Sequence, residues 1–258
     1  MTMGMDDMAL LELAFDLARR AGDAIMVVRE RGFETTHKSD ASPVTEADHA
    51  AEAIIAAGLR AATPDIPVVA EEEIAAGHVP DAADAFWLVD PLDGTREFVA
   101  GGTDFAVCIG LVRGGRAVLG VIGVPAEREL FGGIVGQGAW LRDAAGTRPI
   151  KARAVPAKGL HVVASRRHGT DSTLTDFLSG RSVERITNVG SALKFCRVAA
   201  GVADLYPRFG RTMEWDTAAG QALLEAAGGH VLVAGGDAPL RYGKPGWDNP
   251  SFYCTGAT

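Results

Sequence analysis

Apolar residues recur at helical spacing near the start of the chain. In residues 8–31 they fall close to one helical face, so we predict an amphipathic helix there. The apolar positions are Leu11, Phe15, Ala18, Ile25 and Val28. Residues 36–43 are polar and contain a proline, which predicts a loop. A second helix is predicted to begin near Thr45 and to end before Pro64, because proline cannot continue a helix.

Short apolar runs then predict a series of strands. Residues 66–73 form one run, which ends in three acidic residues, and residues 85–90 form another. Residues 105–125 are two apolar segments on either side of Gly114-Gly115, a pattern typical of a β-hairpin. Residues 129–142 are rich in glycine and predict a further strand with a turn.

The second half of the chain alternates between strands and helices. We predict strands at 160–165 and 202–209, and helices at 172–179, 191–200 and 215–227, the last ending at Gly228-Gly229. This order indicates one compact α/β body of layered sheets and helices. We expect a single domain over residues 1–258. A charged stretch at 143–158 is its best internal boundary, dividing it into halves of about 1–150 and 151–258.

Composition narrows the class of protein. The chain has 258 residues, of which 47% are hydrophobic, so a large core is available. Its formal net charge of −8 argues against binding to polymeric nucleic acid, which needs a basic face. A small anionic ligand remains compatible with this charge, since a few local cations can override the overall field.

Cysteine usage and the N-terminus predict a cytoplasmic protein. Cys108, Cys196 and Cys254 are far apart and lack CxxC spacing, which favours free thiols over disulfides or a zinc site. The N-terminus carries acids where a signal peptide would carry positive charge, and no apolar run reaches the roughly 18 residues of a membrane span. We therefore expect no transmembrane segment. Peripheral association with the inner face of the cell membrane stays compatible with the sequence.

Two aspartates follow the apolar run of residues 85–90. Asp90 and Asp93 are close in sequence, and Pro91 between them stiffens the backbone, so their repulsion is not easily relieved by motion. They could form a polar turn or hold a cation at the end of a strand, where ligands of α/β sheets commonly bind. Gly94 and Thr95 could open a short helix whose free N–H groups face an anion.

Three other acidic features each have an ordinary structural explanation. Residues 71–73 are three consecutive glutamates, which usually form a solvated turn. Asp216 precedes an alanine-rich segment and could be a helix N-cap. Asp48 lies three residues after Thr45, as in a capping box, so the residues alone leave it open between a cap and a catalytic group. If the strand ends converge, Glu71, Asp90, Asp93 and Asp216 form an all-oxygen site suited to Mg²⁺ or Mn²⁺.

Three stretches resemble a known family in order and spacing. They are VVAEEE at 68–73, WLVDPLDGTREF at 87–98 and EWDTAAGQALLEAAGG at 214–229. They are similar to the signatures of the inositol-monophosphatase-like superfamily of metal-dependent, lithium-sensitive phosphatases. The resemblance runs over nearly the whole chain. It implies an α-β-α-β-α sandwich of the inositol monophosphatase and fructose-1,6-bisphosphatase type.

The resemblance also implies a role for each matching residue. Glu71 looks like a catalytic, metal-bridging glutamate and Asp90 like a second bridging ligand. The backbone carbonyl of Leu92, with Asp93 and Asp216, would complete the metal ligands. Thr95 and Asp48 look like the pair that orients and deprotonates the attacking water. The resemblance further implies two or three Mg²⁺ ions, with Mn²⁺ as a substitute and Li⁺ as an inhibitor.

Three further stretches resemble the CysQ-type 3′(2′),5′-bisphosphate nucleotidase branch of this superfamily. They are SRRH at 165–168, GSALKFCRVAAG at 190–201 and DLYPRFG at 204–210. Lys194 and Arg208 are cations that could pair with a second phosphate, although Lys194 could equally be an exposed helix lysine. Glu214, directly before Trp215, departs from the pattern, and we assign it no role in specificity.

The implied substrate contacts extend beyond these two cations. Ser191 could donate a hydroxyl hydrogen bond, Gly190 allows close backbone approach, and His168 could contact the nucleoside, although a solvent-facing histidine is the simpler interpretation. The full set of expected substrate-binding residues is Glu71, Leu92, Asp93, Gly94, Thr95, His168, Gly190, Ser191, Lys194, Arg208 and Asp216.

We therefore expect a hydrolase that removes the 3′-phosphate of adenosine 3′,5′-bisphosphate, and of its 5′-phosphosulfate relative, in sulfate assimilation. An inositol-1-phosphate or sugar phosphatase on the same scaffold is the nearest alternative. A non-catalytic nucleotide or metal sensor is a more distant one. We expect a monomer or a homodimer.

Overall fold

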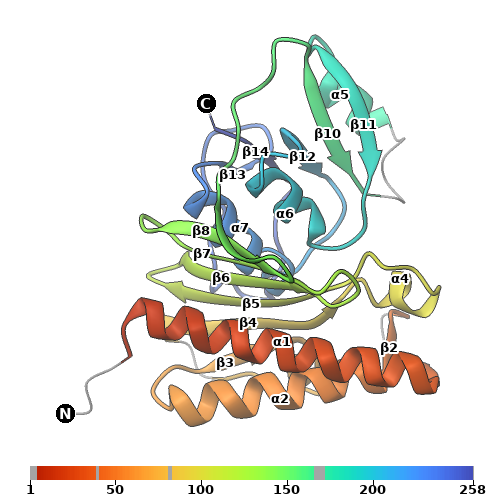
Figure 1. Cartoon of the computed structure of the whole chain (residues 1–258), viewed down its shortest axis with the longest axis vertical. Coiled ribbons are helices and arrows are strands. Elements are labelled where there is room, and N and C mark those ends of the chain that lie inside the picture. Colours follow the sequence, from red (N-terminus) through yellow and green to blue (C-terminus); the bar gives the residue numbers. More distant parts are fainter. Residues whose placement is uncertain (1–4, 39–40, 81–82, 166–171, 258) are drawn as a thin grey trace.

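The computed structural model describes residues 5–38, 41–80, 83–165 and 172–257. Helices and sheets alternate in the order α-β-α-β-α (Figure 1). This arrangement confirms the expected layered fold. None of the helices within the described residues is both long enough and apolar enough to cross a bilayer. The three cysteines are buried and unpaired.

Two long helices form the first layer. They are α1 (Asp7–Arg31) and α2 (Glu46–Ala62), which lie side by side under the larger sheet (Figure 1). The side chain of Asp6 caps α1 by accepting a hydrogen bond from the N–H of Ala9 at 2.8 Å. The five apolar positions predicted to share one face of α1 are all buried, so the predicted periodicity is confirmed.

The second layer is a seven-stranded sheet in sequential order from β3 to β9. Its strands are β3 (Val68–Ala70), β4 (Ala85–Asp93), β5 (Ala106–Arg113), β6 (Arg116–Val124), β7 (Glu129–Ile134), β8 (Gly138–Asp143) and β9 (Gly146–Ile150). The first pair is parallel and the others are antiparallel. The predicted hairpin is confirmed, since Gly114 and Gly115 turn β5 into β6 with φ values of 56° and 69°.

Two short helices lie between the sheets. They are α6 (Leu193–Ala199) and α7 (Ala218–Ala226), and α7 packs on β5, β6 and β7. The backbones approach closely at Gly110, where a Cβ would lie 2.8 Å from the amide nitrogen of Ala219. This approach brings the residues just before α7 against the end of β4.

The five-stranded second sheet has the order β11-β10-β12-β14-β13. Its strands are β10 (Leu160–Ala164), β11 (Val183–Asn188), β12 (Leu205–Arg208), β13 (His230–Val233) and β14 (Phe252–Thr255). Helix α5 (Ser172–Leu178) contributes Phe177 and Leu178 to a small apolar cluster with Leu160, Val162 and Leu205 of this sheet. The chain therefore passes from one sheet to the other between Ile150 and Leu160.

The structure corrects several predicted elements. The predicted loop at 36–43 contains parts of a two-stranded hairpin, β1 (Thr35–His37) and β2 (Pro43–Thr45). The strand predicted at 66–73 ends at Ala70, and its acids begin a short helix, α3 (Glu71–Ala75). Sequence patterns missed β9, β11, β13 and β14. Strands β9 and β11 are edge strands and mostly exposed, so they lack an apolar signal.

Candidate active site

A β-bulge turns two acidic side chains of β4 to the same face of the sheet. Asp90 pairs with Cys108 of β5 and Asp93 pairs with Ala106, so β4 advances by one residue more than β5. Residues three apart in a regular strand point to opposite faces, but one extra residue brings them to one face. Cys108 and Ala106 belong to the core that includes α6 and α7. The predicted proline turn is therefore a bulge within a longer strand.

Four carboxylates surround this end of β4. Burial raises the pKa of Asp90 well above its ordinary value, and repulsion from Glu71, Asp93 and Asp216 raises it further. Burial and repulsion from Asp93 and Glu71 do the same for the pKa of Asp216. Asp216 belongs to a single turn of 3₁₀-helix, η1 (Glu214–Asp216), which packs against β4 and β5. The predicted convergence of these residues is thus present in the fold.

Backbone N–H groups hold one oxygen of each aspartate. Asp90 Oδ1 accepts a hydrogen bond from the amide of Leu92 at 3.0 Å, and Asp216 Oδ2 accepts one from Met213 at 2.8 Å. Asp93 Oδ2 accepts one from the amide of Ala192. These contacts orient the carboxylates, but burial, with added repulsion from neighbouring carboxylates, still leaves all three with a raised pKa.

Lys38 is a site residue that the sequence patterns missed. Its ammonium lies 2.6 Å from Oε1 of Glu71 and 2.6 Å from Oε1 of Glu72, and its side chain is mostly buried. Burial lowers the pKa of Lys38, but attraction to Glu71 and the hydrogen bonds to both glutamates outweigh burial, so the net shift is upward. A lysine in a polar segment carries no signal for partners that are 33 and 34 residues away.

The residues around β4 fit a hard divalent cation. The donors are carboxylate oxygens, without histidine or cysteine, and a divalent cation would relieve the repulsion between them. Among the described residues, no three His, Cys, Asp or Glu side chains already form a coordination shell. Lys38 and backbone groups hold several of the oxygens instead. The cluster is therefore a suitable set of ligands and not a preassembled shell.

Asp48 is both a helix cap and the partner of Thr95. Its Oδ2 accepts hydrogen bonds from the N–H and the hydroxyl of Thr45, both at 2.8 Å, which completes the capping box of α2. Its Oδ1 lies 3.0 Å from the hydroxyl of Thr95, the first residue of α4 (Thr95–Val99). The two interpretations of Asp48 therefore do not compete, because each uses a different oxygen.

A pocket of about 230 Å³ adjoins the carboxylates. Its lining includes seven of the predicted substrate-binding residues: Asp93, Gly94, Gly190, Ser191, Lys194, Arg208 and Asp216. The other lining residues are Arg96, Glu97, Ser165, Ala192, Phe195, Tyr206, Thr212 and Thr217. Lys194 is only 3% exposed, so it is not a surface lysine. Burial lowers its pKa to about 8, although attraction to Asp93 opposes this shift. The fold thus gathers most of the predicted substrate-binding residues around one cavity.

Two polar atoms of the pocket residues are buried without a partner among the described residues. They are the hydroxyl of Ser191 and the Nε of Arg208. The rest of the Arg208 guanidinium donates to Ser165 Oγ at 3.2 Å and to the carbonyl of Arg211 at 3.1 Å. Buried polar groups are rarely left unpaired, so these two atoms indicate a place where a ligand would bind.

Two other predicted contacts have different outcomes. The amide of Gly190 donates to Asp104 Oδ2 at 2.7 Å, and a Cβ at Gly190 would lie 2.7 Å from the Cβ of Asp104. Its small size is therefore needed for packing against Asp104, a contact that the sequence patterns missed. His168 lies outside the described residues.

The buried acids predict a pH dependence of the metal-free protein. Burial raises the pKa of Glu52 to about 7 and of Glu72 to about 7, against an ordinary value of 4.5. Between pH 4.5 and about pH 7, the folded protein keeps protons on these glutamates that the unfolded chain releases. The free energy of unfolding therefore falls as the pH rises through this interval. We expect the Tm in EDTA to fall by on the order of 5 °C from pH 5.5 to pH 7.5.

Thermal unfolding followed by circular dichroism measures this dependence. The variant Glu52→Gln removes one of the titrating groups and should show a shallower decrease. A Tm that rises over this pH interval would contradict the electrostatic description of the site.

Comparisons with known proteins identify the family of this chain. Residues 6–256 match the inositol monophosphatase family. The 3′(2′),5′-bisphosphate nucleotidase CysQ of Salmonella typhimurium is 46% identical over 224 residues, which cover 86% of this chain and 89% of that protein. The protein of the same name from Escherichia coli strain K12 is 42% identical over 246 residues, covering 94% and 98%. The crystal structure of CysQ from Bacteroides thetaiotaomicron superposes with a TM-score of 0.81 at 36% identity, covering 96% and 97%.

The family match over residues 6–256 spans both sheets and the carboxylates of the site. Membership in such a family implies the use of divalent metal ions, which the all-oxygen donor set fits. From the order of its layers, the carboxylates around β4 and the match over residues 6–256, this chain belongs to the inositol monophosphatase family.

Proposed function

We propose that this protein is a Mg²⁺-dependent 3′(2′),5′-bisphosphate nucleotidase. It would remove the 3′-phosphate of adenosine 3′,5′-bisphosphate, giving AMP and phosphate, and would act in the same way on the 5′-phosphosulfate relative. The observation that carries this proposal is a pair of buried donors without partners, Ser191 Oγ and Arg208 Nε. Both residues line the same pocket as Lys194. A substrate with a second phosphate would satisfy both donors.

The carboxylates would hold the metal ions. Glu71 and Asp90 would bridge two cations, and the carbonyl of Leu92 with Asp93 and Asp216 would complete the ligands. Two or three Mg²⁺ ions are expected, with Mn²⁺ as a substitute and Li⁺ as an inhibitor. When bound, such ions activate water and stabilise a leaving oxygen in in-line phosphoryl transfer.

Asp48 and Thr95 would orient the attacking water. When the hydroxyl of Thr95 donates to Asp48 Oδ1 at 3.0 Å, its lone pairs are available to a water hydrogen. Burial raises the pKa of Asp48, which makes its carboxylate a better proton acceptor near neutral pH. The amides of Gly94 and Thr95 would hold the phosphate that is cleaved. Gly94 has a φ of 92°, a conformation that favours glycine.

The substrate would lie across the two halves of the chain. The half at about 1–150 would supply the metal ligands Glu71, Asp90 and Asp93, and the half at about 151–258 would supply most substrate contacts. His168 would contact the nucleoside. We further propose a cytoplasmic enzyme of sulfate assimilation, either a monomer or a homodimer.

An inositol-1-phosphate or sugar phosphatase is the alternative function. The unpartnered Nε of Arg208 favours a bisphosphate, because a monophosphate whose phosphate faces the carboxylates would leave this donor without an acceptor. The ammonium of Lys194 donates to the carbonyls of Val189 and Ser191, and a second phosphate would add a charged partner.

A phosphate-release panel tests the proposed function. The substrates are adenosine 3′,5′-bisphosphate, its 5′-phosphosulfate relative, inositol 1-phosphate and fructose 1,6-bisphosphate, each with Mg²⁺, with EDTA and with added Li⁺. We expect the two nucleotides to have a kcat/KM at least about a hundredfold above that of inositol 1-phosphate, which has no second phosphate, since a lost charge-assisted contact costs about 1.5–3 kcal/mol and two such contacts are at stake. Higher activity on inositol 1-phosphate would favour the alternative. No Mg²⁺-dependent release from any substrate would favour a sensor.

A further inference from the structure

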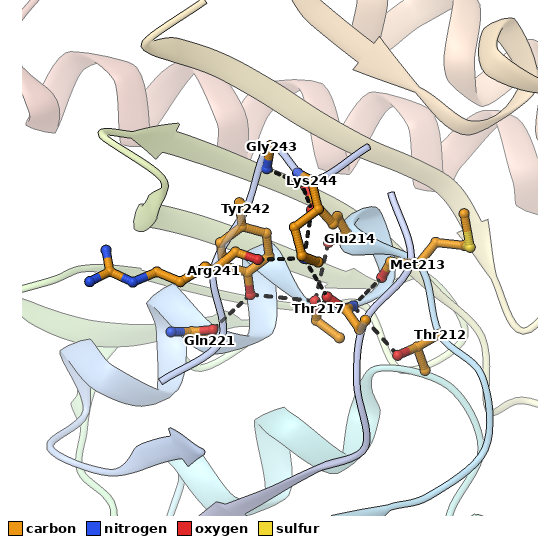
Figure 2. Close-up of polar contacts among 10 residues, drawn as sticks. Thr212, Met213, Glu214, Thr217, Gln221, Arg241, Tyr242, Gly243 and Lys244 are labelled. Carbon is orange, nitrogen blue, oxygen red and sulfur yellow. Dashed lines mark hydrogen bonds and ion pairs between the residues drawn. The ribbon is translucent and has the colours of Figure 1, made fainter. Parts of the chain in front are cut away.

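The turn that carries Asp216 is held by a segment near the C-terminus, residues 241–249, which we call the clamp segment (Figure 2). The amide of Glu214 donates to the carbonyl of Trp247 at 2.8 Å, and the amide of Asn249 donates to the carbonyl of Thr212 at 2.9 Å. These bonds pair the residues just before Asp216 with the clamp segment, about thirty residues further along the chain.

The side chain of Glu214 fastens the clamp segment to this turn. Glu214 is fully buried, and both of its carboxylate oxygens are occupied. Oε2 accepts a hydrogen bond from the amide of Gly243 at 2.7 Å, and Oε1 accepts bonds from the amide and the ammonium of Lys244 at 2.9 and 2.6 Å (Figure 2). A buried charge with this many partners is costly to displace, so Glu214 fixes the position of the turn.

Asn249 fastens the same turn from a second point. Its Nδ2 donates to the carbonyl of Met213 at 2.7 Å and to Thr217 Oγ1 at 3.0 Å, and its Oδ1 accepts from the ammonium of Lys244 at 3.2 Å. Met213 is also the residue whose amide holds Asp216 Oδ2 at 2.8 Å. Asn249 therefore fixes the residues on both sides of η1, and through them the Asp216 carboxylate.

Backbone conformation and packing restrict the clamp segment to one conformation. Gly243, Gly246 and Trp247 have φ values of 85°, 80° and 62°, and such a value in tryptophan persists only where the surroundings enforce it. The ring of Trp247 packs edge-on against Phe86 of β4, with 5.9 Å between centroids. The clamp segment thus links the Asp216 turn to the strand that carries Asp90 and Asp93.

We infer that Glu214 and Asn249 are positioning residues that hold Asp216 in register with the carboxylates of β4. The inference rests on the proposed function, in which Asp216 is a metal ligand. Groups that orient a metal ligand typically contribute ten- to hundredfold to metal affinity. Replacing Glu214 or Asn249 should therefore weaken the binding of the cation that Asp216 would ligate.

Equilibrium binding of Mn²⁺, followed by electron paramagnetic resonance, tests the inference without any substrate. We expect Glu214→Gln and Asn249→Ala each to weaken the affected Mn²⁺ site about tenfold or more, as loss of an orienting group does. The Mg²⁺ concentration that gives half-maximal phosphate release should rise by a similar factor. At saturating Mg²⁺, kcat should return to within about threefold of the wild type, because Asp216 itself is intact.

Asp204→Asn is the matched control. Asp204 is also a buried carboxylate, and it accepts bonds from the amide of His161 at 2.7 Å and from the partly exposed cation Arg153. Neither Asp204 nor these two partners line the pocket. The control should lose thermal stability comparably, yet bind Mn²⁺ within about twofold of the wild type, since it orients none of the proposed ligands.

Two results would overturn the inference alone: wild-type Mn²⁺ affinity in both clamp variants, or an equal loss of affinity in Asp204→Asn. If Glu214→Gln does not fold, the affinity of Asn249→Ala decides between the same outcomes. A wild-type protein that binds no Mn²⁺ would overturn the proposed function and the inference together.

Discussion

Replacing Asp93 with asparagine is expected to lower Mg²⁺-dependent phosphate release by about a thousandfold or more. Losing a residue that only supports a metal ligand typically costs ten- to hundredfold in metal affinity or activity, and Asp93 is proposed to be a ligand itself. Asp93 lies on the face of β4 that also carries Asp90, and its Oδ2 is held by the amide of Ala192. Asparagine keeps the size of the side chain but removes the charge that would hold a cation. A steady-state assay of phosphate release measures the effect.

The same variant is expected to be at least as stable as the wild type without metal. Burial raises the pKa of Asp93, and Glu71 adds repulsion, although Lys194 and the Ala192 amide oppose both effects. The ionised form is thus disfavoured in the folded protein, and a neutral side chain removes this penalty. Thermal unfolding in EDTA checks the expectation. Wild-type turnover would contradict the role in metal binding, and a markedly lower Tm would contradict the electrostatic explanation.

The variant Arg208→Ala should separate the two candidate substrates. We expect kcat/KM for adenosine 3′,5′-bisphosphate to fall about a hundredfold, the size expected for losing a charge-assisted contact to phosphate in a partly buried site. Inositol 1-phosphate turnover should change by less than about threefold, since that substrate has no second phosphate for the guanidinium. The comparison of the two kcat/KM ratios is the measurement.

Arg181→Ala controls for the loss of one positive charge in the second half of the chain. Arg181 is exposed, donates to the carbonyl of Phe177 at 3.2 Å and lies over its ring. It does not line the pocket, so both substrates should be turned over as in the wild type. An equal loss for both substrates in Arg208→Ala would mean that the arginine supports the fold of the site and does not select the second phosphate.

Elements with a strong local pattern were predictable. The long helix α1 has a continuous apolar stripe, and the β5–β6 hairpin has two buried strands around a pair of glycines, so both patterns arise within one element. Strand β11 is exposed along most of its length, and its position depends on pairing with β10. An edge strand of this kind leaves no periodic signal, because its neighbours and not its own burial decide its conformation.

Residue type and short spacing determined the chemistry of the candidate site. The motif around Asp90 and Asp93, with Glu71 and Asp216, specifies oxygen donors and a cation-binding character through its residue types alone. The spacing of Thr45 and Asp48 likewise specifies a capping box, which the structure confirms. These features depend on residue identity and on neighbours within a few residues, and the chain encodes them directly.

Tertiary structure decided what each side chain faces. The bulge in β4 turns Asp90 and Asp93 to one face, and packing buries Lys194 instead of exposing it. The contact of Lys38 with Glu71 and that of Glu214 with the clamp segment join residues about thirty positions apart. Such contacts follow from how sheets and loops pack, and local spacing carries no information about them. The sequence by itself thus determined which donors the site contains, while packing determined which of them meet.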